Sequence, residues 1–262
     1  MNSSLEITGK PASSSSGRRV AIITGGSHGI GAGLVSGFRR EGYAVVATSR
    51  SIGAADEDDY VTVRGDIAEA QTARNVVEQA LNRFARIDCL VNNAGVFIGK
   101  PFTDYTLDEY ALITSVNLAG FFHLTQFVIG LMATQGSGHV VNVTTSLVDK
   151  ANSKRPTALP ALTKGGLAAV TRSLAIEYAS RGIRVNAVAL GVIRTRDDIA
   201  SYTGMADLHP LGRLGEINDV VDGVLYLERA TFVTGETLHS TGAKLREADS
   251  RSREIGQLTR VR

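Results

Sequence analysis

The stretch VAIITGGSHGIG, residues 20–31, decides the fold class. The apolar, β-branched run Val20–Thr24 is typical of a buried strand, and the glycines after it open directly into a helical stretch near residues 30–40. Glycine lets the backbone approach a phosphate closely, and a helix N-terminus offers free N–H donors. The pattern therefore favours a dinucleotide-binding loop over a structural tight turn. Its predicted contacts are Gly25, Ser27, His28, Gly29, Ile30 and Gly31.

Outward from this loop, short apolar runs alternate with longer helical stretches, which is the pattern of βαβ units. Strands are predicted at Val20–Thr24, Ala44–Ser49, Val61–Arg64, Cys89–Asn92, His139–Thr144, Arg184–Val188 and Glu236–His239. Helices are predicted near residues 30–40, 69–84, 107–133, 160–180 and 217–228. We expect an α/β fold, a Rossmann-type doubly wound parallel β-sheet with helices on both faces, in a single domain.

Length and composition agree with one large domain, because the 262 residues are 43% hydrophobic and 21% charged. We expect a flexible, serine-rich segment at residues 1–18, the nucleotide-binding domain at 19–243 and a charged tail at 244–262. The tail is either solvated or a short partner-binding helix.

Charge and cysteine content exclude several classes of protein. A net charge of +2 with scattered arginines implies no nucleic-acid partner. The lone Cys89 cannot form an internal disulfide, and residues 1–18 hold no apolar core of signal-peptide type, so we expect a cytoplasmic protein. The apolar stretch 111–133 carries Asn117, His123 and Gln126, which favours a helix buried in protein over a membrane span. No metal site is expected.

The end of the second predicted strand indicates which cofactor is bound. An NAD-preferring enzyme has a carboxylate here for the ribose 2′-hydroxyl, whereas this chain has Ser49 followed by Arg50. A guanidinium can bind a 2′-phosphate, and His28 could add a second donor. We therefore expect NADP(H) rather than NAD(H), although a surface arginine at a strand end also occurs without any role.

From Arg19 to Gly242 the chain resembles the short-chain dehydrogenase/reductase family. The motifs follow in the family's order: TGGSHGIG at 24–31, RGDI at 64–67, NNAG at 92–95, SVNLAG at 115–120 and RVNAVALGVIRT at 184–195. The resemblance implies cofactor contacts at Asp66, Ile67, Asn93, Ala94, Gly95, Gly191, Ile193 and Thr195, and a relay water near Asn117. Taken singly, Asp66 could be a helix cap and Asn117 a hydrogen-bonded buried amide.

The family's catalytic strip is incomplete here. In the family a serine binds the carbonyl, a tyrosine transfers the proton, and a lysine four residues later lowers the tyrosine pKa and binds ribose. Four residues are about one helical turn, so both side chains share a face. Lys164 is present, but Pro160 stands at the tyrosine position, and no tyrosine lies between Tyr110 and Tyr178. Thr145 is favoured over Ser146 for the serine's role.

The resemblance implies an oxidoreductase acting on a small carbonyl or alcohol, with Asn117, Thr145 and Lys164 as catalytic residues. Candidate proton donors are Lys164 through a water held by Asn117, or Tyr202 or His209 from the lid segment. The rival hypothesis is an inactive NADP(H)-binding pseudoenzyme; an epimerase or dehydratase has less support. Apolar helices at 107–133 and 160–180 resemble the family's pairing helices and imply a homodimer or homotetramer, while Thr241, Gly242 and Ala243 replace the usual DGG end motif.

Overall fold

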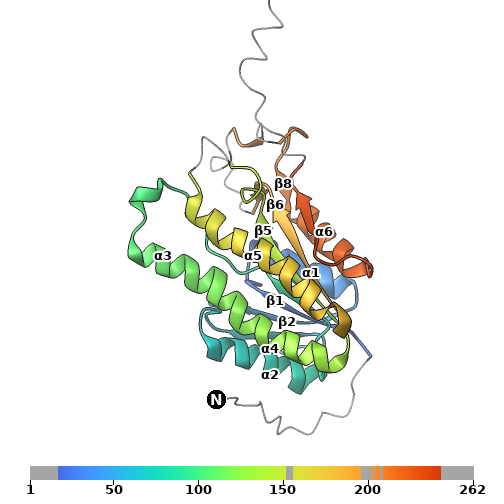
Figure 1. Ribbon diagram of the computed structural model, residues 1–262. Helices are drawn as coiled ribbons and strands as arrows, with labels where there is room; N and C mark the ends of the chain where they lie inside the picture. The colour runs from blue at the N-terminus through green and yellow to red at the C-terminus, as the bar shows by residue number, and fades with distance from the viewer. Residues whose placement is uncertain (1–16, 152–155, 196–201, 203, 207–208, 243–262) are drawn as a thin grey trace, which may run out of the picture.

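The computed structural model describes residues 17–151, 156–195, 202, 204–206 and 209–242 (Figure 1). Seven strands form one parallel sheet in the order β3-β2-β1-β4-β5-β6-β9. Residues 1–16 of the predicted segment 1–18, together with Ala243 and the predicted tail 244–262, lie outside the described residues. The predicted doubly wound α/β fold is confirmed.

The observed strands begin and end within three residues of the predicted ones. They are β1 (Val20–Thr24), β2 (Ala44–Ser49), β3 (Tyr60–Arg64), β4 (Cys89–Asn92), β5 (Gly138–Thr145), β6 (Ile183–Leu190) and β9 (Thr237–Ser240). Two further strands, β7 (Ile193–Arg194) and β8 (Gly215–Glu216), pair with each other in a separate sheet. These two were not predicted, because a strand of two residues has no periodicity to read.

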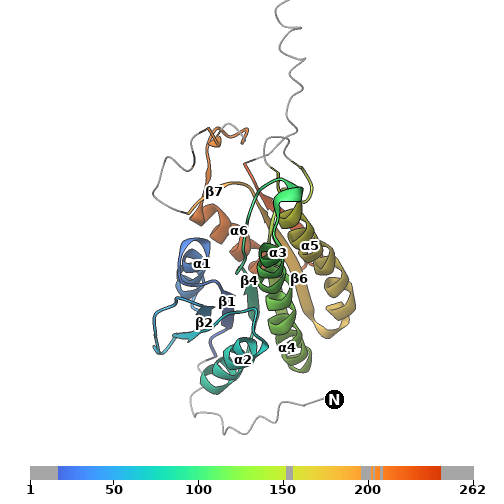
Figure 2. The same ribbon diagram turned by 90° about the vertical axis from the view of Figure 1, so that its left-hand side faces the viewer.

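Helices cover both faces of the sheet. They are α1 (Gly29–Arg40), α2 (Ala70–Phe84), α3 (Leu107–Thr114), α4 (Gly120–Gln135), α5 (Ala158–Tyr178) and α6 (Ile217–Arg229), with short 3-10 turns at Phe102–Asp104 and Ala179–Arg181. Helices α1 and α6 pack together on one face, and α2, α4 and α5 lie on the other (Figure 2). The strands are therefore buried on both faces, which explains their nearly continuous Val, Ile and Ala content.

A π-helical turn, Ser115–Ala119, joins α3 to α4. The combined helix Leu107–Gln135 is long and apolar enough to cross a membrane, by length and composition alone. It packs against α2, α5 and the sheet, and Leu124, Val128 and Met132 belong to the core cluster on that face. A core helix of the domain accounts for its composition. The π turn places Asn117 inside the protein, and such turns are frequent at functional sites.

The edge of the sheet at which the parallel strands begin holds a buried carboxylate, the side chain of Glu228. Tyr43 donates to Glu228 Oε1 at 2.7 Å, and His139 Nδ1 lies 2.6 Å from Glu228 Oε2. The Asn186 side-chain nitrogen contacts His139 Nε2 at 3.0 Å, and its orientation is set by bonds to Glu236 N–H and to a backbone carbonyl. His139 Nε2 therefore accepts, and Nδ1 carries the proton that it donates to Glu228.

This same cluster includes Cys89, and its sulfur, His139 and Glu228 offer ligand atoms within 4.8 Å of one another. A metal at His139 Nδ1 would require a proton on Nε2, facing the amide N–H that already points there. Arg184 and Arg19 approach the carboxylate at 3.7 Å and would oppose a further cation. The cluster fits a hydrogen-bonded structural carboxylate, and burial raises the pKa of the Cys89 thiol well above its usual value.

Candidate active site

The glycine loop turns sharply from β1 into α1. Gly25 and Gly29 have positive φ values of 69° and 54°, a conformation that favours glycine. A Cβ atom on Gly31 would lie 1.9 Å from the Gly25 carbonyl oxygen, so the loop and the helix approach too closely for any side chain there. His28 precedes α1 and makes no side-chain cap hydrogen bond within the described chain, so the first N–H groups of α1 remain open to an anion.

The NNAG segment closes the other side of this loop. Asn93 N–H and Ala94 N–H donate to Thr24 Oγ1 at 3.0 and 2.9 Å, and Asn93 Nδ2 donates to the Thr24 carbonyl at 2.9 Å. Strands β1 and β4 are neighbours in the sheet although β2 and β3 lie between them in the chain. This is the topological switch point, where doubly wound sheets bind ligands.

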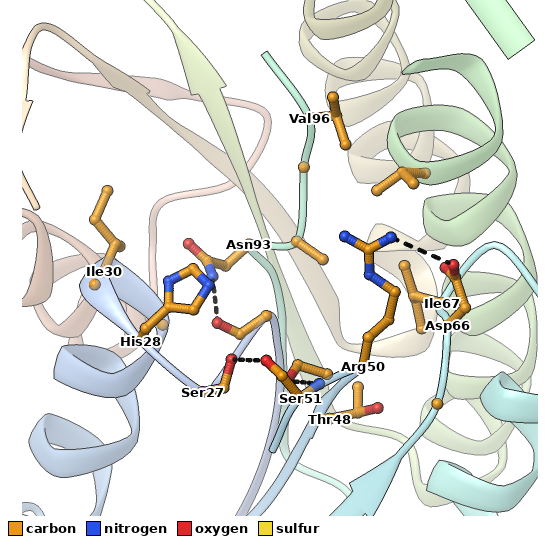
Figure 3. Close-up of a pocket in the computed structure, with 18 of the residues that line it drawn as sticks. Ser27, His28, Ile30, Thr48, Arg50, Ser51, Asp66, Ile67, Asn93 and Val96 are labelled. Atoms are coloured by element: carbon orange, nitrogen blue, oxygen red, sulfur yellow. Dashed lines mark hydrogen bonds and ion pairs between the residues drawn. The ribbon is translucent and has the colours of Figure 1, made fainter. Parts of the chain in front are cut away.

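A cleft of about 300 Å³ opens at this point. It brings together thirteen of the predicted cofactor residues: Gly25, Ser27, His28, Gly29, Ile30, Gly31, Arg50, Asp66, Ile67, Asn93, Ala94, Gly95 and Thr195 (Figure 3). Predicted residues that do not line it are Lys164, Gly191 and Ile193. Lining residues that were not predicted as contacts are Thr48, Ser49, Ser51, Gly65, Val96 and Val116.

One end of the cleft is rich in hydroxyl groups and carries the predicted phosphate-binding arginine. Arg50 Nη1 lies 4.0 Å from Asp66 Oδ2, and the Arg50 side chain is 68% exposed, so its guanidinium is free to reach a ligand (Figure 3). Ser27 Oγ and Ser51 Oγ are 3.4 Å apart and link the glycine loop to the end of β2. The arrangement offers one cation and two hydroxyls to an anion.

Thr48 is a buried polar residue on the wall of this cleft. The residue is 1% exposed, and its hydroxyl has no hydrogen-bond partner among the described residues. Because the hydroxyl oxygen is covered by protein atoms, the fit of a dinucleotide rests on the glycine loop. There the first N–H groups of α1 are open to a phosphate, and the glycines allow it to approach the backbone closely.

Lys164 reaches from α5 to the ends of β4 and β5. Its Nζ donates to the Val143 carbonyl at 2.8 Å, and a Cβ on Gly95 would lie 3.0 Å from the same nitrogen. The ammonium group is therefore beside the cleft wall, although Lys164 itself does not line the cleft. Burial lowers the pKa of Lys164 from 10.5 to about 8, because desolvation disfavours the charged form.

Asn117 is held by a set of hydrogen bonds around the cleft wall. Val96 N–H donates to Asn117 Oδ1 at 2.8 Å, while Asn117 Nδ2 donates to the Val96 carbonyl at 3.0 Å and to Thr163 Oγ1 at 3.1 Å. The side-chain amide thus fastens the segment after β4 to α5. It is the hydrogen-bonded buried amide considered as an alternative from the sequence, and its predicted role at a relay water stays a prediction.

Pro160 lies in the first turn of α5, which begins at Ala158 after Thr157. An N–H in this turn has no partner within the helix, so proline removes no helical hydrogen bond there. Pro160 is buried, and its carbonyl lies 3.3 Å from the Thr163 hydroxyl. Proline is therefore compatible with this helix position, and its side chain has no acidic hydrogen.

Two hydroxyls lie at the end of β5, where a carbonyl ligand is predicted: Thr145 is its last residue and Ser146 follows it. Leu147 N–H donates to Thr145 Oγ1 at 3.3 Å, and nothing among the described residues accepts the hydroxyl proton of Thr145. Ser146 is 3% exposed, and within the described structure its hydroxyl has no partner. Thr145 is the more accessible of the two, which supports the preference stated from the sequence.

In the segment after β6, His209 was considered as a proton donor from a mobile lid, but the structure places it elsewhere. His209 is 3% exposed, and its ring nitrogens contact Val192 N–H at 3.2 Å and the Thr241 carbonyl at 2.7 Å. A Cβ on Gly191 would lie 2.6 Å from the His209 ring. His209 therefore packs behind the cleft as a structural residue, and it does not have the free ring nitrogen that a proton donor swinging in from a lid requires.

Tyr202 lies nearer to the cleft. The Thr195 N–H donates to the Tyr202 hydroxyl at 3.0 Å, and the two side-chain oxygens are 3.4 Å apart. Thr195 lines the cleft, and Ile193 lies in the core beneath it, paired through β7. Of the expected lid at residues 197–213, residues 197–201, 203 and 207–208 lie outside the described residues.

Comparison with known proteins assigns the chain to a family. The family model described as enoyl-(acyl carrier protein) reductase matches residues 25–242. The chain is 35% identical over 245 residues to L-xylulose reductase from Bos taurus, covering 87% of this chain and 97% of that protein. It is 32% identical over 238 residues to the 3-oxoacyl-(acyl-carrier-protein) reductase FabG from Salmonella typhimurium, covering 86% and 96%. The chain belongs to the short-chain dehydrogenase/reductase family, a family of oxidoreductases.

Solved structures of family members have the same fold. The structure of ElxO with NADP bound superposes with a TM-score of 0.80 at 26% identity, covering 87% of this chain and 98% of that one. The 3-ketoacyl-(acyl-carrier-protein) reductase from Brucella melitensis, complexed with NADH, gives 0.79 at 29% identity, with 86% and 98% covered.

Proposed function

We propose that this protein is an NADP(H)-dependent oxidoreductase that interconverts a small carbonyl compound and the corresponding alcohol. The observation that carries the proposal is the cleft at the switch point between β1 and β4, where the glycine loop, the NNAG segment and Arg50 converge. ElxO, a relative by structure, was solved with NADP bound, which supports the same cofactor class here.

The cofactor supplies or accepts the hydride, and the protein's residues bind and orient. The open N–H groups of α1 bind the pyrophosphate. Asp66 and Ile67 flank the adenine end, and Lys164 binds the ribose near Gly95. The Thr145 hydroxyl donates to the substrate oxygen and sets its orientation. Such positioning can lower the barrier by about 7–11 kcal/mol without any proton donor.

The preference for the phosphorylated cofactor is supported by Arg50, Ser27 and Ser51 at one end of the cleft. One charge-assisted hydrogen bond contributes about 1.5–3 kcal/mol. Asp66 lies 4.0 Å from Arg50. Because both groups are exposed to solvent, the carboxylate only partly weakens the attraction of the guanidinium for a phosphate.

The second candidate function is a pseudoenzyme that binds NADP(H) without turnover, and Pro160 is the observation that favours it. A general acid contributes about 10²–10⁴ in rate, so its loss slows hydride transfer without forbidding it. A tyrosine-to-phenylalanine variant of ElxO was solved with NADPH bound, so a missing tyrosine hydroxyl is compatible with cofactor binding in that relative.

Two measurements test the function. Fluorescence titration with NADPH and NADH reports binding, and saturable binding that is tighter for NADPH is expected. NADPH oxidation with a panel of ketones and aldehydes then reports catalysis. Binding without turnover of any substrate would favour the pseudoenzyme, and Pro160→Tyr in the same panel separates a decayed site, which gains activity, from a rebuilt one, which loses it.

We also propose that the protein is a cytoplasmic homodimer or homotetramer. Large apolar side chains are exposed on α3, α4 and α5: Leu107 (86%), Phe122 (54%), Leu162 (61%) and Ile176 (81%). Contact with a second copy would remove them from water. Light scattering coupled to size exclusion gives the oligomeric state, and a monomer at all concentrations would contradict the assembly.

A further inference from the structure

The site lacks the group that would transfer a proton to the substrate oxygen, and the structure indicates what replaces it. The first turn of α5 presents Pro160 where a phenol would lie, and Pro160 has no N–H or O–H. One turn later, Lys164 places its ammonium nitrogen beside Gly95, a residue of the cleft wall. Lys164 thus follows the proline by one helical turn, and its nitrogen lies at the cleft wall.

Several other protic groups around the cleft are already engaged, and the Thr145 hydroxyl is the group assigned to orient the substrate oxygen. Among the described residues, the Asn117 amide bonds to Val96 and Thr163. The Thr163 hydroxyl lies 3.3 Å from the carbonyls of Leu159 and Pro160, to which it donates. Both ring nitrogens of the buried His209 contact the backbone. The Tyr202 hydroxyl lies against the Thr195 backbone, to one side of the α5 strip.

We propose that the Lys164 ammonium group is itself the general acid of this enzyme and delivers a proton directly to the carbonyl oxygen. The assignment rests on the proposed oxidoreductase function and names the donor for it. As the carbonyl carbon receives the hydride, the C=O π electrons move to oxygen and an Nζ–H bond breaks to give O–H. Lys164 is left as a neutral amine and regains a proton from water. The overall change consumes one carbonyl, one reduced cofactor and one proton.

The geometry leaves Lys164 able to do this. Of its three N–H bonds, one is directed to the Val143 carbonyl at 2.8 Å, which holds the nitrogen in place. Within the part of the chain that the structure describes, the other two have no hydrogen-bond acceptor, and Gly95 has no side chain between Nζ and the cleft. A Cβ at position 95 would stand 3.0 Å from Nζ, so glycine leaves more room for this approach than any other residue.

The surroundings also make the ammonium a usable acid near neutral pH. The segments packed around Nζ present Gly95 from the end of β4, Asn117 from the π turn and Val143 from β5, and none of these groups titrates. With no carboxylate among them to retain the proton, burial lowers the pKa of Lys164 to about 8. An acid with a pKa near the working pH is the efficient one.

This role of Lys164 sets how the rates of reduction and oxidation depend on pH. Below pH 8 the nitrogen is protonated and reduction proceeds at its full rate. Above pH 8 the protonated fraction falls, so kcat for reduction should fall about tenfold per pH unit, while the alcohol oxidation, which needs the neutral amine, should rise to a plateau.

The test compares Lys164→Arg and Lys164→Met with Lys100→Arg, a control of the same chemical type at a lysine that pairs with Glu109 away from the cleft. Arginine keeps the positive charge but does not release a proton near neutral pH. We expect both Lys164 variants to lose about 10²–10⁴ in kcat. We expect Lys164→Arg to bind NADPH within about tenfold of the wild type, and the control to retain wild-type values.

A second readout does not depend on activity. In protein labelled with ¹³C-lysine, the ε-methylene signal absent from Lys164→Arg belongs to Lys164, and its chemical shift should titrate near pH 8 in the cofactor-free protein. A wild-type protein in which every lysine signal titrates near 10.5, the ordinary value, would overturn the assignment, and this outcome needs no folded variant.

The remaining outcomes separate the two proposals. A wild type that binds NADPH and reduces carbonyls with a flat pH profile from pH 7 to 10, or an active Lys164→Arg variant, would overturn the role of Lys164 alone. No saturable NADPH signal, or binding without turnover, would overturn the oxidoreductase function and the donor assignment with it.

Discussion

Replacing Gly31 by alanine tests the close approach on which the cofactor loop depends. The added Cβ would lie 1.9 Å from the Gly25 carbonyl oxygen and 2.9 Å from Asn93 Nδ2. The first contact is with backbone, so no side-chain rotation relieves it. The glycine loop must therefore move away from α1, and Asn93, which pins Thr24 at the switch point, must move with it.

The expected loss of stability follows from the kind of contact that the new methyl group makes. Inserting a methyl group into a closely packed site costs typically about 1–3 kcal/mol, and we expect Gly31→Ala to lower the free energy of unfolding by about 2 kcal/mol. Because the displaced loop also carries the N–H groups that face the cleft, NADPH binding should weaken by at least about tenfold, equivalent to about 1.4 kcal/mol.

Gly130→Ala is the matched control. A Cβ on Gly130 meets nothing within 4 Å, and the residue lies on the exposed side of α4. Alanine there should stabilise the protein by about 0.5–1 kcal/mol and leave NADPH affinity unchanged. Urea unfolding followed by circular dichroism and fluorescence titration with NADPH measure the two effects. A Gly31→Ala protein with wild-type stability and affinity would refute the reasoning.

Three further predictions concern other parts of the molecule. Arg50→Gln should weaken NADPH binding by about tenfold or more while changing NADH binding by less than about twofold, and parallel titrations that show equal losses would contradict the proposed phosphate contact. Tyr43→Phe removes a donor from the buried Glu228 carboxylate and should lower the free energy of unfolding by about 1–3 kcal/mol in denaturant titrations, with unchanged NADPH affinity; an unchanged midpoint would argue against that network. The Arg213 guanidinium lowers the pKa of Asp219 from 3.8 to about 2, so the stabilisation is complete above about pH 4 and is lost as the pH falls through 2. In Asp219→Asn the melting temperature should therefore change less with pH in this range than in the wild type. The same pH dependence in both proteins would exclude the Arg213–Asp219 pair as the cause of the acid destabilisation.

The strands were predictable because their signal is local. A run such as VAIIT needs no knowledge of its neighbours to indicate a strand buried on both faces, and the observed β1 and β2 have the predicted bounds. The cofactor loop was predictable for the same reason, since positive φ values at Gly25 and Gly29 depend on residue type.

Contacts between distant parts of the chain were not predictable. His139 and Glu228 are 89 residues apart, and no pattern in the sequence pairs them. The same holds for His209, which was considered as a lid residue and instead bridges Val192 and Thr241. Thr48, within the apolar run of β2, looks like an ordinary strand residue until the fold places it at the cleft wall, where its hydroxyl has no hydrogen-bond partner among the described residues.

The amino-acid sequence alone determined the doubly wound sheet, the loop that faces the cofactor and the absence of a phenol at Pro160, because glycine conformation, strand periodicity and residue identity are properties of short segments. The tertiary structure alone decided how acidic the Lys164 ammonium is. Its pKa depends on partial burial beside β4, the π turn and β5, three segments that meet only in the folded protein, where they reduce the solvation of the nitrogen.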